Sequence, residues 1–311
     1  MQNNLAPVVL FVYNRPSHTG QCLDSLLKNP LADQSILYIY ADGPKENSTE
    51  EQLAKINEVR KVIRGKKWCK EVHIIESATN KGLANLITDQ GASSNFIIDT
   101  VTDIVNRHGK IIVLEDDLVL SEYFLNYMNE GLTIYETCSN IYSINGYMFP
   151  VKFKELKTVL MPYTSSWGWA TWKDRWAVFD YEMNQKKNIA DNPFLRQRFN
   201  LGDYDYASML DYDKNHWDIR WYYSVFIRNG LCVFPTQTMV KNTGFDGSGT
   251  HHKAESEQDL NILTNIIIPV KIDSEIDLEF YSLYLNYFKD KDEKSIIKRR
   301  VKKIKKLFNL S

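Results

Sequence analysis

The sequence predicts an α/β protein with a mostly parallel central sheet flanked by helices. Apolar runs of strand length recur at Val8–Tyr13, Ile36–Ala41, Val72–Ile75 and Ile111–Leu114, and the stretches between them are long enough to form helices. Parallel strands joined by right-handed helical crossovers give an open sheet that binds ligands at its carboxyl edge. Of the 311 residues, 43% are hydrophobic, so the chain can bury a substantial core.

Polar or turn residues follow three of the four runs. They are Asn14-Arg15-Pro16 after the first run, Asp42-Gly43-Pro44 after the second, and Glu115-Asp116-Asp117 after the fourth. Because parallel strands end at one edge of a sheet, these residues are expected to converge on one cleft. For the first two groups the alternative is that they are ordinary turn residues.

The acidic triplet Glu115-Asp116-Asp117 predicts a cation site. Three adjacent carboxylates after a buried strand repel one another, and a hard divalent cation such as Mg²⁺ or Mn²⁺ is the usual partner that neutralises them. The alternative is that the acids favour the N-terminus of a helix over Leu118–Tyr135. That alternative explains the charge but not three acids in a row.

The second half of the chain is rich in aromatic residues. From about residue 140 the strand–helix alternation fades, and the stretch that follows holds most of the tryptophans: Trp167, Trp169, Trp172, Trp176, Trp217 and Trp221. Aromatic faces suit the apolar faces of sugar rings. Core packing is the alternative for each of them.

The net charge of −1 hides a strong asymmetry. Residues 295–308 carry seven Lys or Arg and no acid, which leaves 31 basic against 39 acidic residues, about −8, in the body. An acidic body argues against a nucleic-acid substrate. Apolar residues recur at helical spacing in the tail, which predicts an amphipathic helix on an anionic membrane surface. A terminal helix docked on the body is the alternative.

The cysteines and the N-terminus indicate a cytoplasmic protein. Cys22, Cys69, Cys138 and Cys232 lack the paired spacing of metal or redox sites, which favours a reducing compartment. The run Val8–Tyr13 is too short for a signal peptide or a membrane span. The expected location is the cytoplasm, with peripheral contact to the inner face of the cell membrane through 295–308.

The acidic triplet and its surroundings resemble a known family. The segment 113–118, followed by Phe124 and Tyr127, is similar to the Glu-Asp-Asp form of the Asp-x-Asp motif in the α-mannoside β-1,2-N-acetylglucosaminyltransferases, which have the GT-A fold. Further similar segments follow in the same order over about residues 7–252: Asn14-Arg15-Pro16 with 22–27, Ala41-Asp42-Gly43, Gly168-Trp169, Trp217-Asp218 and 228–235. A bacterial-type relative of this family is therefore expected.

The resemblance implies a metal-dependent glycosyltransferase. It would move a sugar from a nucleotide diphosphate donor, a UDP-sugar, to a glycan or lipid-linked glycan, with inversion and with Mn²⁺ or Mg²⁺ as cofactor. Residues 1–139 would form the nucleotide-sugar half, 140–270 the acceptor half, and 271–311 the C-terminal helices. Two alternatives remain: a sugar-1-phosphate nucleotidyltransferase, whose glycine-rich N-terminal signature is missing, and a non-catalytic carbohydrate-binding protein.

The resemblance also assigns roles to the residues at the strand ends. Arg15 would contact the nucleotide, Asp42 the base, Glu115 the hydroxyls of the donor sugar, Asp116 the ribose or the metal, and Asp117 the metal. An arginine fork suits phosphate, and a carboxylate accepts a hydrogen bond from a uracil N–H. A surface salt bridge is the alternative for Arg15.

In the acceptor half, Asp218 corresponds to the general base of the family, with Asp246 in reserve. A helix-capping role is the alternative for Asp218. The run Trp167–Trp172, with Trp169 at its centre, is expected to wall the sugar site. It has more aromatic residues than the family, so the family's acceptor preference is not transferred.

Two glycine-containing segments are expected to approach the diphosphate. Asn80-Lys81-Gly82 precedes an expected helix, which would bring Lys81 to the phosphates, although a simple turn is equally consistent with the sequence. Residues 241–252 hold three glycines and end in two histidines, which predicts a mobile loop that closes over the donor. His251 would then bind the metal, and exposure to solvent is the alternative.

Overall fold

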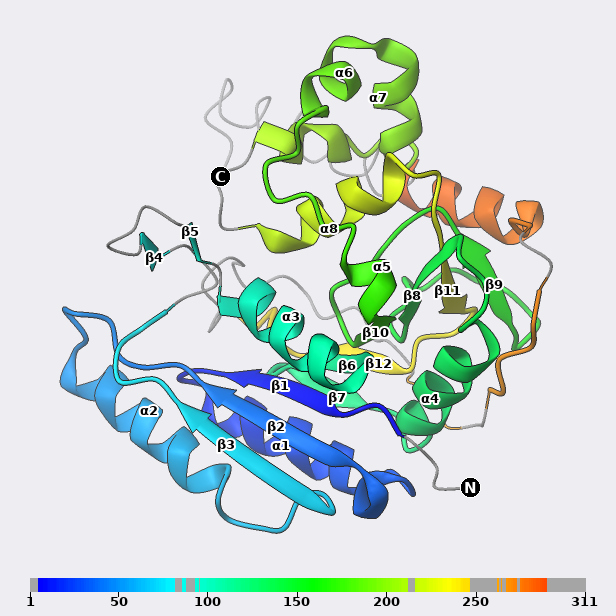
Figure 1. The fold of residues 1–311 in the computed structure, drawn as a ribbon. Helices are drawn as coiled ribbons and strands as arrows, with labels where there is room; N and C mark the ends of the chain where they lie inside the picture. Colours follow the sequence, from blue (N-terminus) through cyan, green and yellow to red (C-terminus); the bar gives the residue numbers. More distant parts are fainter. Residues whose placement is uncertain are drawn as a thin grey trace, which may run out of the picture.

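A computed structural model describes residues 5–81, 86–87, 93–94, 96–211, 216–246, 262, 264, 267–272 and 275–289. One eight-stranded sheet runs through the molecule in the order β3-β2-β1-β6-β10-β8-β11-β9, and helices cover both of its faces (Figure 1). The α/β class predicted from the sequence is confirmed.

The first half of the sheet consists of parallel strands joined by helices. The strands are β1 (Val8–Val12), β2 (Ile36–Ala41), β3 (Glu71–Glu76) and β6 (Lys110–Glu115), and the helices are α1 (Pro16–Leu27), α2 (Glu50–Val62) and α3 (Phe96–His108). All four predicted strands are confirmed, with ends that differ by a residue at most. β1, β2 and β6 are nearly continuous apolar runs because helices bury both faces of the sheet.

The second half of the sheet mixes parallel and antiparallel strands. β10 (Trp169–Trp172) is antiparallel to both β6 and β8 (Ile141–Asn145), so it joins the two halves into one sheet. β11 (Leu231–Pro235) is parallel to β8 and antiparallel to the edge strand β9 (Thr158–Met161).

Shorter elements complete the described chain. They are η1 (Ala32–Gln34), β4 (Leu86–Ile87), β5 (Ser93–Ser94), β7 (Leu118–Leu120), α4 (Phe124–Ile134), α5 (Lys173–Trp176), α6 (Lys186–Asp191), α7 (Pro193–Phe199), η2 (Tyr206–Asp211), α8 (Trp217–Phe226), β12 (Val240–Asn242) and a helix over 278–289. β12 pairs with β7 in a separate antiparallel ribbon.

The tryptophans of the second half mainly form core. Trp169 stacks on Trp217 with ring centroids 5.5 Å apart, and Trp176 lies 5.0 Å from Trp221. These four side chains, at most 4% exposed, fill the space between the sheet and helices α5 and α8. The packing interpretation therefore holds for these four, whereas Trp167 is only partly buried.

The structure rules out one alternative interpretation and corrects two local predictions. The acids 115–117 do not begin a helix, because strand β7 follows them and α4 starts only at Phe124. Within the described residues no helix directly follows Lys81; β4 comes first and α3 begins at Phe96. Lys241 and Asn242 belong to strand β12 rather than to a loop.

Other predictions fall partly outside the described residues. The basic tail 295–308 and His251 both lie outside the described residues.

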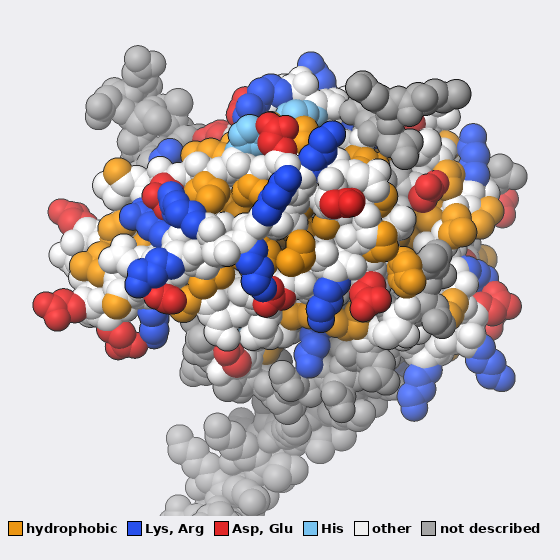
Figure 2. All heavy atoms as spheres, turned by 90° about the horizontal axis from the view of Figure 1, so that it is seen from below, with side chains coloured by type: hydrophobic (Ala, Val, Ile, Leu, Met, Phe, Trp, Pro, Cys, Tyr) orange, Lys and Arg blue, Asp and Glu red, His pale blue; other side chains and the backbone are white. Residues whose placement is uncertain are grey.

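The four cysteines carry free thiols. Among the described helices, none combines the length and the apolar character needed to cross a bilayer. Viewed from below, acidic and basic side chains alternate on the surface, so the negative charge of the body is not gathered on this face (Figure 2).

Truncating Trp221 to alanine is expected to lower the free energy of unfolding by about 4 kcal/mol, because it leaves a cavity among packed indoles. Phe194→Ala provides the matched control, since this side chain is 72% exposed. Urea unfolding followed by circular dichroism measures both. Similar losses in the two variants would contradict the role of the tryptophan cluster as core.

Candidate active site

The register of the sheet brings the predicted strand ends together. Phe11 of β1 pairs with Tyr40 of β2 on one side and with Glu115 of β6 on the other. The residues that follow these three strands therefore leave the sheet at the same edge. Arg15 and the acidic triplet meet there, and Asp42 follows the neighbouring strand β2 at the same edge.

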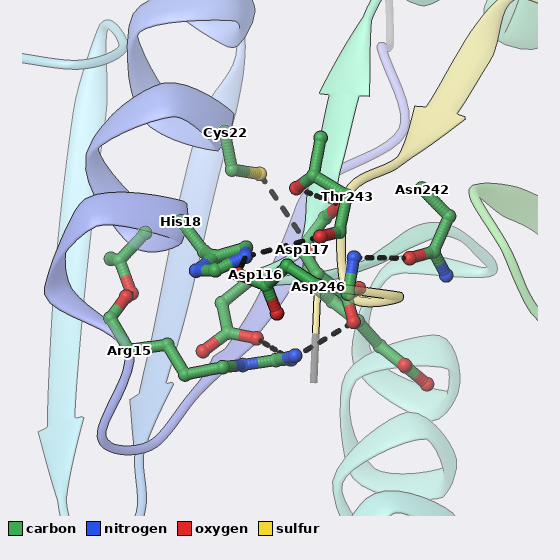
Figure 3. A network of polar contacts seen from close by, with 11 residues as sticks. Arg15, His18, Cys22, Asp116, Asp117, Asn242, Thr243 and Asp246 are labelled. Atoms are coloured by element: carbon green, nitrogen blue, oxygen red, sulfur yellow. Dashed lines mark hydrogen bonds and ion pairs between the residues drawn. The ribbon is translucent and has the colours of Figure 1, made fainter. Parts of the chain in front are cut away.

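Arg15 forms ion pairs with two carboxylates of the triplet (Figure 3). It stands at the N-cap of α1, and its Nη2 contacts Asp116 Oδ1 and lies 3.0 Å from Asp117 Oδ2. Asp116 is 4% exposed and Asp117 is 8% exposed. Arg15 thus balances part of a negative charge that is almost entirely removed from solvent.

Arg15 pairs with only one oxygen of Asp116 and one oxygen of Asp117. Asp116 Oδ2 and Asp117 Oδ1 are buried, and neither has a hydrogen-bond partner in the described part of the chain. Burial, together with the charge of Asp117 and against the opposing effect of Arg15, raises the pKa of Asp116 to about 6. Buried carboxylate oxygens without partners are suited to a divalent cation.

A complete protein cage for a metal is not formed. No group of three or more His, Cys, Asp or Glu side chains with metal-binding geometry exists among the described residues. The donor set of Asp116 and Asp117 alone fits Mg²⁺ or Mn²⁺, which typically take one or two carboxylates and complete their shell with water and phosphate oxygens. The residues present therefore fit the cation predicted from the sequence.

Glu115 and Asp218 come close enough for their charges to interact. Burial and the charges of Asp117 and Asp116 raise the pKa of Glu115 well above its usual range, and the charge of Asp218 raises it too. These residues are far apart in sequence, and the start of α8 brings Asp218 to the end of β6. Sequence reasoning placed Asp218 in the site, and its charge acts on Glu115 in the folded chain.

Asp218 lies in the first turn of α8, but it is not the N-cap, which is His216. Burial raises the pKa of Asp218, while hydrogen bonds to the backbone of Ile219 and of Asp218 itself oppose that rise. The carboxylate therefore interacts with the first turn of its helix and remains more basic than an exposed aspartate.

Asp42 organises the neighbouring turn. Its Oδ1 accepts hydrogen bonds from the backbone N–H groups of Gly43 at 2.8 Å and Lys81 at 2.7 Å, and its Oδ2 accepts from Asn80 Nδ2 at 2.9 Å. The ammonium group of Lys81 lies 5.6 Å from the ring centroid of Phe96. Lys81 thus contributes its backbone at the strand ends, while its side chain packs on α3.

The chain after β12 passes directly over the acidic pair. The backbone N–H and the hydroxyl of Thr243 both donate to the carbonyl oxygen of Asp117, at 2.8 and 2.9 Å. A Cβ atom on Gly244 would lie 2.3 Å from Asp117 Oδ2, so any larger residue here would displace the ion-paired carboxylate of Asp117. Asp246 follows, with its Oδ2 3.3 Å from His18 Nε2 (Figure 3).

Sequence reasoning did not identify His18, and it included Thr243 and Gly244 only as members of the loop expected over 241–252. His18 lies three residues after Arg15 in α1, a spacing that places both on one helix face. That spacing was the signal in the sequence that could have placed His18 near the site. The glycines of 241–252 indicated a segment near the diphosphate, but the contacts of Thr243 and Gly244 with Asp117 join positions more than 120 residues apart, so the local sequence did not identify this partner.

Trp169, expected at the sugar site, is fully buried, and its indole stacks within the core. Trp167 is the partly exposed member of that run. Its ring lies edge-on to Tyr147 at 4.5 Å and to Phe245 at 5.6 Å. Phe245 belongs to the segment after β12 that passes over Asp117. Trp167 is therefore the tryptophan of this run that contacts that segment.

No family model and no curated protein matches this sequence. Among solved structures, residues 1–349 of S. aureus TarS align with a TM-score of 0.41 and 12% identity, covering 77% of this chain and 60% of that one. Mouse xyloside xylosyltransferase 1 in its apo form aligns at 0.33 and 12%, covering 71% and 80%. The galactosyltransferase LgtC, in complex with donor and acceptor sugar analogs, aligns at 0.34 and 10%, covering 73% and 86%.

This chain therefore spans about three fifths of the first of these structures. At TM-scores below 0.5 the likenesses assign no activity, and the function has to be inferred from the site itself.

Arg15→Ala is expected to destabilise the metal-free protein by about 3 kcal/mol, because it leaves two buried carboxylates without their cation. The loss should shrink as pH falls from 7 to 5. Removing Arg15 takes away an effect that lowers the pKa of Asp116, so this carboxyl becomes protonated at higher pH and loses its uncompensated charge.

Urea unfolding in the presence of a chelator, at several pH values, measures this effect. The double variant Arg15→Ala/Asp116→Asn should recover part of the stability at pH 7. A loss that is the same at pH 5 and pH 7 would show that the balance of charge is not the cause.

Proposed function

We propose that the protein is a metal-dependent glycosyltransferase of the GT-A type. It would transfer a sugar from a nucleotide diphosphate donor, a UDP-sugar, to a glycan or lipid-linked glycan, with inversion at the anomeric carbon. The observation that carries this proposal is the pair Asp116 and Asp117. Each has one oxygen paired with Arg15 and one buried oxygen that no described residue contacts by a hydrogen bond, at the edge where α/β sheets bind ligands.

In this proposal Asp117 and Asp116 hold Mn²⁺ or Mg²⁺. When bound, the cation would neutralise the charge that develops on the departing nucleoside diphosphate. Arg15 is 19% exposed at its side chain and already lies against both carboxylates, so its planar fork can also clamp a phosphate oxygen. Asp42, at the neighbouring strand end, would face the base.

Glu115 would orient the donor sugar. Its raised pKa favours the protonated form, which can donate a hydrogen bond as well as accept one. A carboxyl group that does both suits a sugar hydroxyl, which is itself donor and acceptor. This property follows from burial beside two other acids, so it depends on the same cluster that holds the cation.

Asp218 would act as the general base. Its carboxylate would take the proton from the acceptor hydroxyl while that oxygen bonds to the anomeric carbon and the bond from this carbon to the diphosphate oxygen breaks. Burial makes Asp218 more basic than an exposed aspartate, which favours this proton transfer. Asp246, the reserve candidate, is already paired with His18.

Three further expectations from the sequence belong to this proposal. His251 would complete the cation site, the tail 295–308 would contact an anionic membrane, and the acceptor would be presented at the inner face of the membrane. Each concerns residues or partners outside the described part of the chain.

Calorimetry with UDP is expected to detect binding in the presence of Mn²⁺ and little binding with a chelator. Asp117→Ala should abolish the Mn²⁺-dependent part, because it removes one of the two carboxylates that hold the cation. Asp205→Asn is the control, since Asp205 pairs with Arg196 on the exposed surface. Equal binding by wild type and Asp117→Ala would exclude the proposed cation site.

Asp218→Asn is expected to lower kcat for sugar transfer by about 10²- to 10⁴-fold, the usual contribution of a general base, while UDP–Mn²⁺ binding stays near that of wild type. In the wild type, kcat should fall as pH decreases through the raised pKa of Asp218, because the base must be unprotonated. Transfer assays with candidate UDP-sugars across a pH series measure both effects. Full activity in Asp218→Asn would assign the base to another residue.

A further inference from the structure

The segment 244–246 makes contacts with three separate parts of the chain. Gly244 lies over the carboxylate of Asp117, Phe245 packs edge-on against Trp167, and Asp246 pairs with His18 of α1. Thr243, just before this segment, is hydrogen-bonded twice to the backbone of Asp117. The chain is thus fastened on both sides of the point where it covers the acidic pair.

His18 makes the contact on the α1 side. Its Nε2 lies 3.2 Å from the carbonyl oxygen of Thr243 and 3.3 Å from Asp246 Oδ2 (Figure 3). Both partners accept hydrogen bonds, so Nε2 must carry a proton to satisfy either of them. The His18 side chain is 11% exposed, whereas that of Asp246 is 48% exposed, so the pair stands at the rim of the site with the histidine on its inner side.

The close approach of Gly244 makes this contact important for the acidic pair. Gly244 also lies near Arg15, since an added Cβ would be 3.1 Å from Arg15 Nη1. The segment therefore covers both members of the Arg15–Asp117 ion pair. Keeping water out of such a site strengthens the electrostatic interactions within it.

We infer that His18 is a positioning residue for the cation and donor site. It holds Asp246 and the carbonyl of Thr243, and thereby keeps Gly244 seated over Asp117 and Arg15. The inference rests on the proposed function only for what the site binds; the fastening of the segment is a property of the protein alone. His18 contacts neither the reacting sugar nor the acceptor in this assignment.

Hydrogen exchange of the metal-free, full-length protein tests the fastening directly. His18→Ala and Asp246→Ala should each increase amide exchange in the peptide containing 242–246, because the backbone there loses its anchor. The double variant should exchange no faster than His18→Ala, since His18→Ala already removes both contacts of the histidine. His73→Ala is the matched control, because His73 lies on the edge strand β3 with 42% of its side chain exposed.

Calorimetry with UDP and Mn²⁺ then tests the consequence. His18→Ala should raise the dissociation constant for UDP in the presence of Mn²⁺ by about tenfold. This is the loss of affinity expected when a hydrogen bond to a charged group is removed. His18→Gln, whose amide can still donate to Thr243 O or Asp246, should recover part of the affinity. Loss of affinity without recovery in His18→Gln would point to general damage rather than to this contact.

The two proposals can fail separately. Unchanged exchange over 242–246 in His18→Ala overturns the fastening role, whatever the protein binds. Increased exchange with unchanged or tighter UDP–Mn²⁺ binding overturns the positioning role. If the wild-type protein does not bind UDP with Mn²⁺, the proposed function fails, and with it the positioning role, while the exchange result still stands.

Discussion

The buried ion pairs of Arg15 with Asp116 and Asp117 are the constraint on which the site depends. Two carboxylates with almost no exposure cannot remain charged side by side without a cation, and Arg15 supplies only part of the compensation. The remaining buried oxygens have no hydrogen-bond partner among the residues that the structure describes. The local structure follows from this: α1 begins where its N-cap side chain can reach the triplet, and the segment 244–246 passes so close to Asp117 that a side chain at Gly244 would displace its carboxylate.

The sheet makes this arrangement possible by joining two halves of different character. The parallel half delivers strand ends to one edge, whereas the mixed half contributes β10 beside β6 and supports α8, which carries Asp218. The small β7–β12 ribbon then brings the chain back over the acids. Arg15, Asp218 and the segment 243–246 thus lie around the carboxylates of 115–117. The function proposed above draws on all four of these parts of the chain.

The indoles behind the site have a structural role that suits this arrangement. Trp169, Trp176, Trp217 and Trp221 are buried against one another. They fix the start of α8 relative to β10, and so fix Asp218 relative to Glu115. Aromatic residues that could have formed a sugar-binding wall are therefore used to position a helix, and Trp167 alone of its run remains partly exposed beside Phe245.

The sequence by itself determined the four parallel strands and the common edge at which Arg15, Asp42 and the acidic triplet follow them, because strand periodicity and strand-end polarity are local signals and parallel strands share an edge. It did not determine the burial of Trp169 or the contact of Asp246 with His18. It also did not predict that a strand, rather than a helix, follows Asp117. These features depend on pairings such as β7 with β12 and β6 with β10, which join residues far apart in the chain. The burial of a side chain and its ion pairs depend on which residues surround it after folding. Only the tertiary structure could therefore decide them.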